Sequence, residues 1–421
     1  MTCTRRQFIT TAALAAAAPP AVFGQNNSSP LLEKLTLFEA DKGGYKLYRI
    51  PGIVVTRRGT VLAYCEARKS SSDWGTIDIL LRRSTNHGTT WDAPRRIAEV
   101  AGPKSRSPVA LEKKQGNPDD VTYNNPVAIA DHRTGAVHFL FCLEYARCFY
   151  LRSDDDGVTF TKPVDITSAF ESLRSRYPWR VIATGPAHGI QLKNGRLVVP
   201  VWLSPGLTGN GHGPSVTSVI YSDDHGRTWR AGEIIGLDTP ELISPNEAAV
   251  VELADGRVLL NLRSPSKANR RAIATSKNGA TGWSKPVFDE QLLEPVCMAS
   301  IIRVTARPRH RRNRIVFANP HNLERADGKA EPGSGRDRQN LSVKLSYDEA
   351  RTWPVSKTLE PGPSAYSDLA VGRDGMIYCF YENGNADGSG SPYRRLTLAR
   401  FNLEWLTDGK DSITIGKGAG I

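Results

Sequence analysis

The segment "SDDHGRTW" at residues 222–229 places a serine, an aspartate and a glycine at two-residue intervals and ends in a Thr-Trp pair. This spacing suits a tight turn closed by local side-chain hydrogen bonds, with the tryptophan packed beneath it. Four segments repeat the pattern: "STNHGTTW" (84–91), "SDDDGVTF" (153–160), "SKNGATGW" (276–283) and "SYDEARTW" (346–353). Their starts lie 54 to 70 residues apart. The chain therefore contains an internal repeat.

Short β-rich runs fill the chain between these segments, as in "GAVHFLFCL" (135–143) and "GRLVVPVWL" (195–203). The only convincing amphipathic helix is a short one around "ITSAFESLRSR" (166–176). Many short strands with a repeat of about 65 residues predict an all-β fold, a six-bladed β-propeller of four-stranded antiparallel blades. A jelly roll or a sandwich fits this period poorly.

The five segments resemble the Asp-box (BNR) repeat of sialidases and related six-bladed propellers. The box at 222–229 matches fully, and the box at 153–160 differs only in ending with Phe. The other three are degraded, because Asn86 replaces the aspartate, 276–283 has shifted residues and Ala350 replaces the glycine. The resemblance implies turns on the outside of the blades, so the boxes predict the fold and not an activity.

Near the start of the chain, Arg5 and Arg6 are followed by an alanine-rich apolar run that ends in small residues and prolines. Residues 1–24 resemble a twin-arginine export signal, and residues 25–421 are expected to form one propeller domain. The alternative is an N-terminal helix of the mature domain. Elsewhere no run approaches the roughly 20 apolar residues that a membrane helix needs. We expect a soluble, monomeric protein in the periplasm or outside the cell.

The net charge of +12 falls to +10 when the two signal arginines are removed. A surplus of this size suits an acidic substrate or surface but identifies neither. The densest basic run, "RPRHRRNR" at 307–314, is interpreted as a solvated hairpin loop rather than a nucleic-acid patch. No nucleic-acid partner is expected.

The five cysteines after the predicted signal form no CxxC or Cys/His cluster, which argues against a metal site. No Gly-rich phosphate loop is present, so no cofactor is required. Cys142 and Cys148 are close enough in sequence to bridge, and a structural calcium in the loops is also conceivable; both stay open.

Three arginines stand at the ends of predicted strands, in "YRIPGIVVT" (Arg49), "LNLRSPS" (Arg263) and "GRDRQNLSVKLS" (Arg338). A surface guanidinium is the ordinary interpretation of each one alone. In a propeller, however, the starts of the inner strands converge on one axis. Three arginines from three blades could then hold a single carboxylate by bidentate contacts.

A more specific resemblance follows from motif order: "YRIP", "EAR" followed by Asp73, "NE" sixteen residues before an arginine, "RQNL" and "YSDL". In this order they resemble the exo-α-sialidase (neuraminidase) family of bacterial and animal type, from about Leu35 to the last blade. Each motif alone is weak, but the combination is specific.

The resemblance assigns a role to each matching position. Arg49, Arg263 and Arg338 match the triad that binds the sialic acid carboxylate. Asp73 matches the general acid/base on a mobile loop, Tyr366 the nucleophile, and Glu247 the acid that activates it. Glu382 matches the carboxylate that steadies the first arginine, and Arg68 matches a pocket arginine.

Elementary chemistry agrees with these roles. A carboxylate nucleophile would be repelled by the carboxylate on the anomeric carbon of sialic acid, whereas a neutral phenol is not; sialidases are an exception to the two-carboxylate rule. Tyrosine, with a pKa near 10, needs a base such as Glu247 and nearby arginines to ionise. Asp73 must be protonated to donate to the leaving oxygen, which a partly apolar site beside Trp74 would favour. Asp78 is the rival acid.

We therefore expect a retaining exo-α-sialidase that hydrolyses terminal sialic acids of glycoproteins, glycolipids and oligosaccharides through a tyrosyl-enzyme intermediate. One alternative is hydrolysis or transfer with a related nonulosonic acid. Another is a non-catalytic sialic-acid-binding or structural propeller, which would be expected to lack the acid or the nucleophile. His188, Asn124 and Asn125 lie in segments that resemble those facing the pocket rim in the family, and hydrogen bonds that fix a loop are an equally good interpretation of each. Trp202 is expected in the pocket or the core.

Overall fold

Strands make up most of the regular structure in the described residues, which are 1, 29–384 and 390–413 of the computed structural model. The helices there are short: α1 (Pro108–Glu112), η1 (Thr167–Phe170), α2 (Glu171–Arg174) and α3 (Leu403–Leu406). None of them is long and apolar enough to cross a membrane. The all-β prediction and the short helix at 166–176 are confirmed, whereas the predicted signal, except for its first residue, lies outside the described residues.

The strands form five sheets in the described part of the chain. The first sheet contains β2 (Leu47–Val55), β3 (Val61–Arg68), β4 (Ile77–Ser84) and β5 (Arg95–Arg96). The second contains β6 (Tyr123–Ala130), β7 (Val137–Leu143), β8 (Arg147–Ser153), β9 (Val164–Asp165) and, parallel to β6, β11 (Ala187–His188). The third contains β10 (Val181–Thr184), β12 (Ile190–Gln191), β13 (Leu197–Ser204), β14 (Val216–Ser222) and β15 (Arg230–Ala231). The fourth contains β16 (Ala248–Glu252), β17 (Val258–Leu262), β18 (Arg270–Ser276) and β19 (Val287–Leu293).

The fifth sheet joins two groups of strands through one long strand, β23 (Val355–Val371). Its first half pairs with β22 (Gln339–Ser346), which continues to β21 (Arg314–Pro320) and β20 (Ser300–Thr305). Its second half pairs with β24 (Ile377–Asn383), followed by β25 (Arg395–Phe401) and β1 (Leu32–Glu39). The first strand of the chain thus completes the sheet that holds the last one, which ties the two ends of the described chain together.

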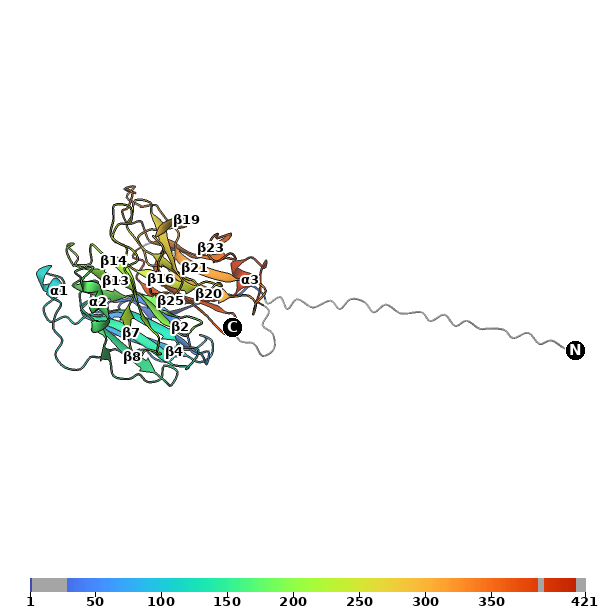
Figure 1. Ribbon diagram of the computed structural model, residues 1–421, viewed down its shortest axis with the longest axis horizontal. Helices are drawn as coiled ribbons and strands as arrows, with labels where there is room; N and C mark the ends of the chain where they lie inside the picture. The colour runs from blue at the N-terminus through green and yellow to red at the C-terminus, as the bar shows by residue number, and fades with distance from the viewer. Residues whose placement is uncertain (2–28, 385–389, 414–421) are drawn as a thin grey trace.

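Apolar clusters fill the spaces between neighbouring groups of strands. Strands such as β7, "VHFLFCL", are buried on both faces because each sheet packs against a neighbour on either side. Val127 of β6 and Val199 of β13 share one cluster, and Leu260 of β17 lies in the next cluster. Another cluster joins Ile53 of β2 to Phe380 of β24, and so connects the last group of strands with the first. Figure 1 shows this succession: β4, β7 and β8 lie at the bottom, β13 and β14 at the left, β19 at the top and β23 at the right.

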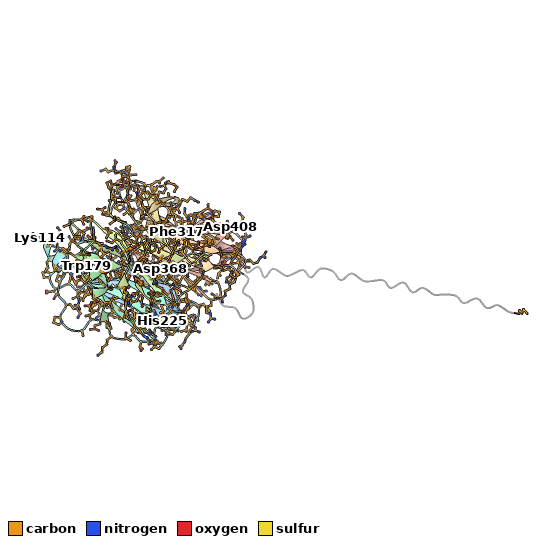
Figure 2. All side chains as sticks on the ribbon, viewed as in Figure 1. Lys114, Trp179, His225, Phe317, Asp368 and Asp408 are labelled. Carbon is orange, nitrogen blue, oxygen red and sulfur yellow. The ribbon has the colours of Figure 1, made fainter. Side chains whose placement is uncertain are left out.

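One strand of each group lies toward the interior of this arrangement. In succession β2 contacts β6, β6 contacts β12, β12 contacts β16, β16 contacts β20, β20 contacts β23, and β23 contacts β2. Asp368, in the middle of the second half of β23, lies near the centre of the body in Figure 2, whereas Lys114 and Asp408 lie near its edge. Residues near the starts of β2, β6 and β16 line one cavity, and the last residues of the same strands line another, so the starts gather at one end of the molecule and the ends at the other.

The five box segments form the turns that their sequences predict. In the fully matching box, the Ser222 hydroxyl accepts the Gly226 N–H at 2.8 Å, and Asp224 accepts the Thr228 N–H at 2.9 Å. The degraded box at 346–353 keeps this pattern, because the Ala350 N–H donates to the Ser346 hydroxyl at 2.9 Å. Ala350 does so at φ +63°, a conformation that favours glycine, so the substitution carries local strain.

The five cysteines in the described residues are buried and unbridged. Cys142 of β7 lies directly opposite Cys148 of β8 in the ladder, yet the two side chains remain thiols. Burial raises the pKa of the Cys148 thiol well above its usual value. Both cysteines pack in the apolar core, as expected of small hydrophobic side chains.

Candidate functional site

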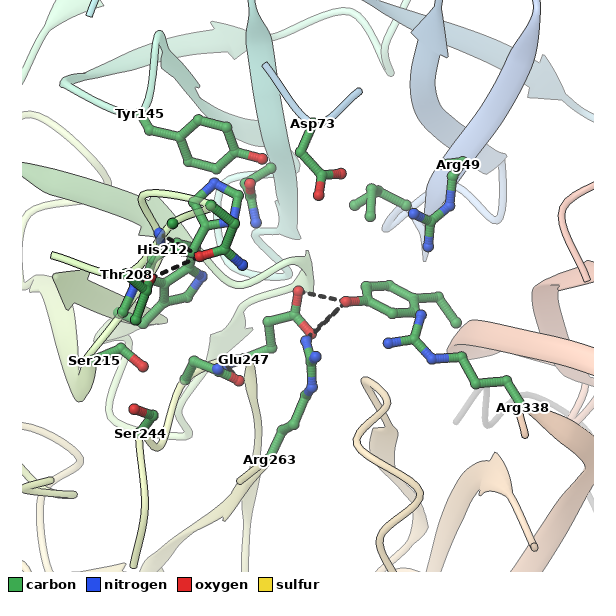
Figure 3. Close-up of a pocket in the computed structure, with 18 of the residues that line it drawn as sticks. Arg49, Asp73, Tyr145, Thr208, His212, Ser215, Ser244, Glu247, Arg263 and Arg338 are labelled. Carbon is green, nitrogen blue, oxygen red and sulfur yellow. Dashed lines mark hydrogen bonds and ion pairs between the residues drawn. The ribbon is translucent and has the colours of Figure 1, made fainter. Parts of the chain in front are cut away.

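A cavity of about 540 Å³ opens where the interior strands begin (Figure 3). Arg49 near the start of β2, Glu247 immediately before β16 and Tyr366 in β23 all line it. Arg263 and Arg338 reach it from the chain just after β17 and just before β22. Arg49 and Tyr366, which are more than 300 positions apart in the sequence, therefore face the same cavity.

Tyr366 lies at the centre of a hydrogen-bonded group on the cavity wall. Its hydroxyl lies 2.6 Å from both carboxylate oxygens of Glu247, to which it donates. Arg263 Nη1 donates to the same hydroxyl at 2.9 Å and also pairs with Glu247. Burial raises the pKa of Tyr366 well above its usual range; Glu247 acts in the same direction, while Arg263 and Arg338 oppose the shift. The resting phenol is therefore neutral, with a base and a cation already in contact with its oxygen.

The three predicted arginines surround the Tyr366 ring. The guanidinium carbons of Arg49, Arg338 and Arg263 lie 5.3, 5.2 and 6.0 Å from the ring centroid. The side chains of Arg49 and Arg263 are only 12% and 15% exposed, so their charges are largely shielded from water. Three shielded cations around one phenol form a site suited to an anion, because a desolvated guanidinium binds a carboxylate strongly.

Glu382, at the end of β24, holds Arg49 in place. Its two oxygens accept Arg49 Nε at 2.9 Å and Nη2 at 3.3 Å. It also accepts the backbone N–H groups of Ile50 and Tyr366, each at 3.1 Å. One fully buried carboxylate therefore ties the first arginine to the strand that carries the tyrosine, and the satisfied contacts make its burial tolerable.

Asp73 lies across the cavity from Glu247 and is paired with Arg68. Arg68 Nη1 donates to Asp73 at 2.6 Å, while Arg68 Nη2 and Nε bond the buried Glu66 at 2.5 and 2.9 Å. Burial by itself would raise the pKa of Asp73, but Arg68, His212 and Arg49 together hold it well below its usual range. Because the Asp73 side chain remains 47% exposed, it is open to the cavity.

The segment that carries Asp73 is fixed by the neighbouring residue. Trp74 is 1% exposed, and its indole N–H donates to the Asn210 carbonyl at 2.8 Å. The His212 ring stacks on Trp74 with centroids 5.1 Å apart. Arg106, itself paired with Glu144, donates to the Trp74 carbonyl. The acid is thus held over the cavity by contacts from two separate loops.

The wall opposite the arginines contains residues that the sequence did not single out. They are Tyr145, Thr208, His212, Ser215 and Ser244 (Figure 3), and Asn246 is a further lining residue of the cavity. His212 Nε2, Ser215 Oγ and Trp202 Nε1 are buried and make no hydrogen bond within the described residues. The Gly-rich run "GNGHGP" (209–214) around His212 was the available signal for this wall, but its position depends on the stacking with Trp74.

The secondary candidates divide between the cavity and other places. Asn125 and Trp202 line the cavity, whereas Asn124 donates to Asn125 in the buried layer behind it. Asp78 is not among the lining residues, because its carboxylate is bound by Tyr45 and Arg96 at 2.7 and 3.0 Å. The expectation that His188 lies at the rim of this pocket is wrong.

His188 instead bonds Asp368 beyond the floor of the site. His188 Nδ1 lies 2.6 Å from Asp368 Oδ1, and Asp368 also accepts the Ile53 N–H at 2.8 Å and the Ser300 hydroxyl at 2.9 Å. The contact with Asp368 follows from β11 lying beside β2 and β23, and no local sequence pattern encodes this neighbourhood.

The His188–Asp368 pair gives a pH-dependent stability. Burial lowers the pKa of His188, but Asp368 outweighs this effect and raises the pKa above the usual 6.5. The stabilisation is therefore fully present below about pH 6.5 and is lost as the pH rises through the raised pKa. We expect His188→Gln to reduce the free energy of unfolding by about 1–3 kcal/mol at pH 6. Denaturant unfolding at pH 6 and pH 9 should show the smaller difference at pH 9; an equal difference would contradict this account.

Among the described residues, no group of three or more His, Cys, Asp or Glu side chains is arranged to hold a metal ion. The charged contacts of the site are instead made by arginines with carboxylates and with Tyr366.

Three comparisons relate this chain to known proteins. A model of the BNR repeat-like domain matches residues 105–379. A sialidase of Micromonospora viridifaciens is 30% identical over 90% of this chain, which spans 55% of that relative. Sialidase-3 of Rattus norvegicus is 27% identical over 83% of this chain and 90% of its own length. The solved structure of the Hadza microbial sialidase Hz136 is 24% identical, with a TM-score of 0.68 over 89% of this chain and 69% of that one.

Proposed function

Because the chain belongs to the sialidase family, we propose that it is an exo-α-sialidase that releases terminal sialic acid from glycans with retention of configuration. The observation that carries the proposal is the Tyr366 hydroxyl, bonded to Glu247 and Arg263 inside a group of three arginines. A neutral nucleophile among cations is what an anionic sugar requires, since a carboxylate nucleophile would repel the substrate.

The arginines supply the binding step. The carboxylate of the sugar would lie between Arg49, Arg263 and Arg338, whose guanidinium groups surround the Tyr366 ring. Arg338 is held by the Val296 carbonyl at 2.8 Å and the Tyr393 hydroxyl at 3.1 Å, and Arg49 by Glu382. Arginines held in advance bind an anion with little loss of side-chain entropy. The anomeric carbon, which bears the carboxylate, then lies beside the Tyr366 oxygen.

The first chemical step forms a bond between the Tyr366 oxygen and the anomeric carbon. Glu247 takes the phenol proton across the 2.6 Å contact, and Arg263 stabilises the negative charge on the oxygen. Asp73 gives a proton to the departing glycosidic oxygen as the bond to the aglycone breaks. In the second step Asp73 removes a proton from water, which attacks the anomeric carbon and releases Tyr366 to recover its proton from Glu247.

Asp73 can carry a proton only when its ion pair with Arg68 is weakened, because this pair favours the ionised carboxylate. In the free site Arg68 holds Asp73 ionised, so donation requires that bound sugar loosen this contact or exclude water from the carboxylate. Either change raises the pKa of Asp73, because both weaken the stabilisation of its charged form. Arg68 keeps its second partner, Glu66, and would remain in place during the exchange.

The wall opposite the arginines would receive the substituents across the sugar ring from the anomeric carbon. Trp202 Nε1, His212 Nε2 and Ser215 Oγ are buried there without partners in the described residues. Buried polar atoms of this kind favour a ligand that bonds them, so an acylamino or polyhydroxyl substituent fits this wall. The same wall would also accept a related nonulosonic acid, which is the second candidate substrate.

A six-bladed propeller accounts for how these residues meet. Support comes from the closed succession of contacts through β2, β6, β12, β16, β20 and β23. Division of the seven-stranded sheet at β23 gives two four-stranded groups, one completed by β1, which also supports six blades. The starts of six interior strands would then surround one axis and bring Arg49, Glu247 and Tyr366 to the same opening.

The role of Asp73 is tested by changing the leaving group. We expect Asp73→Ala to lower kcat/KM by roughly a hundredfold or more on 3′-sialyllactose, whose sugar leaving group needs a proton. The loss should be only severalfold on a nitrophenyl sialoside, since a nitrophenolate leaves without one. Asp78→Ala, which removes the nearby carboxylate outside the cavity, should leave the ratio of the two rates unchanged. Equal losses on both substrates would contradict general acid catalysis by Asp73.

The activity itself is tested by hydrolysis of 4-methylumbelliferyl α-sialoside, with proton NMR of the first product formed. Release of the α-anomer before mutarotation would support retention. Release of the β-anomer would contradict the tyrosyl intermediate. No hydrolysis of any nonulosonic acid glycoside would favour a sialic-acid-binding propeller. Release of methylumbelliferone only in the presence of an acceptor glycan, with the sugar then found attached to that acceptor, would favour transfer.

A further inference from the structure

A second and larger cavity, of about 890 Å³, lies where the interior strands end. We call it the basin. Each interior strand that begins at the site reaches the basin with its last residues: β2 with Val55, β6 with Ala130, β16 with Glu252 and β23 with Val371. The basin and the site therefore occupy opposite ends of the same strands.

The turns around the basin are strongly basic. Each follows an interior strand, and together they carry eleven Arg or Lys residues against three Asp residues. These basic turns are residues 56–60, 131–136, 192–196, 253–257, 306–313 and 372–376. The hairpin loop around Arg307, predicted to be a solvated loop, is one of them. These six turns thus gather a net charge of +8 at one end of the molecule.

Backbone carbonyls hold successive cations around this end. Arg373 donates to the Arg57 carbonyl at 3.1 Å, and Arg57 donates to the Arg133 carbonyl at 2.9 Å. Arg133 donates to the Lys193 carbonyl at 2.5 Å, and Lys193 to the Ala254 carbonyl at 3.3 Å. Each basic side chain thus reaches the turn of the next group of strands. A carbonyl fixes the position of a cation without neutralising its charge, so like charges remain close together.

Three cations of these turns are paired with carboxylates, Arg196 with Asp223, Arg257 with Asp255 and Arg312 with Asp411, but none of the three lines the basin. Glu252 lines it, and burial raises the pKa of that group. Glu349 is taken by Arg303, whose Nε also donates to the Glu252 carbonyl at 2.8 Å. Arg57, Arg307 and Arg373 bond backbone carbonyls, which leaves N–H groups of each guanidinium for a ligand. A concave surface lined by one sign of charge concentrates ligands of the opposite sign.

The walls of the basin are apolar below this basic rim. Ile190 and Val371 are half-buried among its lining residues, and Val54, Val55 and Ile302 keep 7%, 8% and 7% of their surface exposed. A small inorganic anion would leave these walls uncovered, and a flat anionic surface would meet only the rim. A ligand that fits has an apolar face and several anionic groups at its edges, as sugar rings bearing carboxylates do.

We propose that the basin binds an acidic oligosaccharide, with sugar faces on the apolar walls and carboxylates on the guanidinium groups of the rim. This second site goes beyond the proposed hydrolysis and does not depend on it, because no residue of the basin lines the catalytic cavity. It would let the protein hold an anionic glycan at one end while the other end acts on a terminal sugar.

Isothermal titration with tetragalacturonic acid, which has four carboxylates and no sialic acid, tests the proposal. Wild type should bind this probe and should not bind neutral maltotetraose. Arg307→Glu/Arg373→Glu should weaken binding by roughly tenfold or more, since it removes two charged contacts and adds two repulsions. Arg147→Glu/Arg325→Glu, a partly exposed pair outside the basin with the same change in charge, should bind as wild type does.

The variants must be folded for this comparison. Thermal unfolding should give melting temperatures close to that of wild type. Arg307→Glu alone is the second variant, because Arg307 bonds only its own turn, through the Arg311 carbonyl and Asn313. Hydrolysis of a fluorogenic sialoside should be unchanged in both variants. The proposal is overturned if wild type does not bind the probe, if the control pair weakens binding equally, or if tripolyphosphate binds and tetragalacturonic acid does not.

Discussion

Replacement of Tyr366 with Phe is expected to lower kcat on a fluorogenic α-sialoside by roughly a thousandfold or more, which corresponds to about 4 kcal/mol. The change removes only the oxygen that bonds Glu247 and Arg263, while the ring keeps its place among the three arginines. Substrate binding should therefore change less than kcat, because the arginines that would hold the carboxylate remain. Initial rates over a range of substrate concentrations separate the two effects.

A matched control is available in the same chain. The Tyr381 hydroxyl donates to Glu360 at 2.6 Å, the same distance as in the site, but this pair does not line the cavity. Tyr381→Phe should leave kcat and KM unchanged within about twofold, although it removes an equivalent hydrogen bond. If Tyr366→Phe kept a third or more of the wild-type activity, the tyrosine would not be the nucleophile.

Replacement of Glu247 with Gln should lower kcat by about a hundredfold to a thousandfold. A glutamine oxygen can still accept a hydrogen bond from Tyr366, but it cannot take the phenol proton. Arg263 would also lose its charged partner and keep only the tyrosine hydroxyl in this group. Glu360→Gln, in the matched pair outside the cavity, should leave kcat unchanged. A Glu247→Gln enzyme with wild-type kcat would show that Tyr366 loses its proton by another route.

The two residues should also behave as one unit. Tyr366→Phe/Glu247→Gln is expected to be no slower than the slower of the two single variants, because each removes the same proton transfer. Losses that multiplied would instead indicate that Glu247 and Tyr366 act in separate steps. The ratio of the four rates, measured with one substrate at saturation, gives this coupling directly.

The local parts of the structure followed from short stretches of sequence. The Ser222 and Asp224 side chains bond backbone groups four residues away, so a pattern of eight residues is enough to predict the turn. Strands such as "VHFLFCL" were evident from their length, their apolar content and the turn residues beside them. The degraded box at 346–353 was also predictable, because Ser346 and Asp348 retain the two side chains that close it.

The site residues were predictable only as members of a motif set. Nothing near Tyr366 in the sequence distinguishes it from a packing tyrosine, and its partner Glu247 is 119 positions away. The His212 wall was not predicted and the rim position expected for His188 was wrong, because each depends on contacts between sheets. Asp78 and Asp73 are five residues apart, yet only Asp73 opens to the cavity, since Tyr45 and Arg96 hold the Asp78 carboxylate.

The sequence by itself therefore determined the repeat, the all-β class and the set of arginines, acids and tyrosine to which the proposed function assigns the reaction. Hydrogen bonds within a turn and alternation within a strand depend on neighbours a few residues away, which the sequence states directly. The tertiary structure alone decided that Arg49, Glu247 and Tyr366 share one cavity. It also decided that the basic turns meet at the opposite end around the basin. These contacts between residues distant in the sequence depend on how whole sheets pack against one another. That packing is determined by buried surfaces distributed over the entire chain.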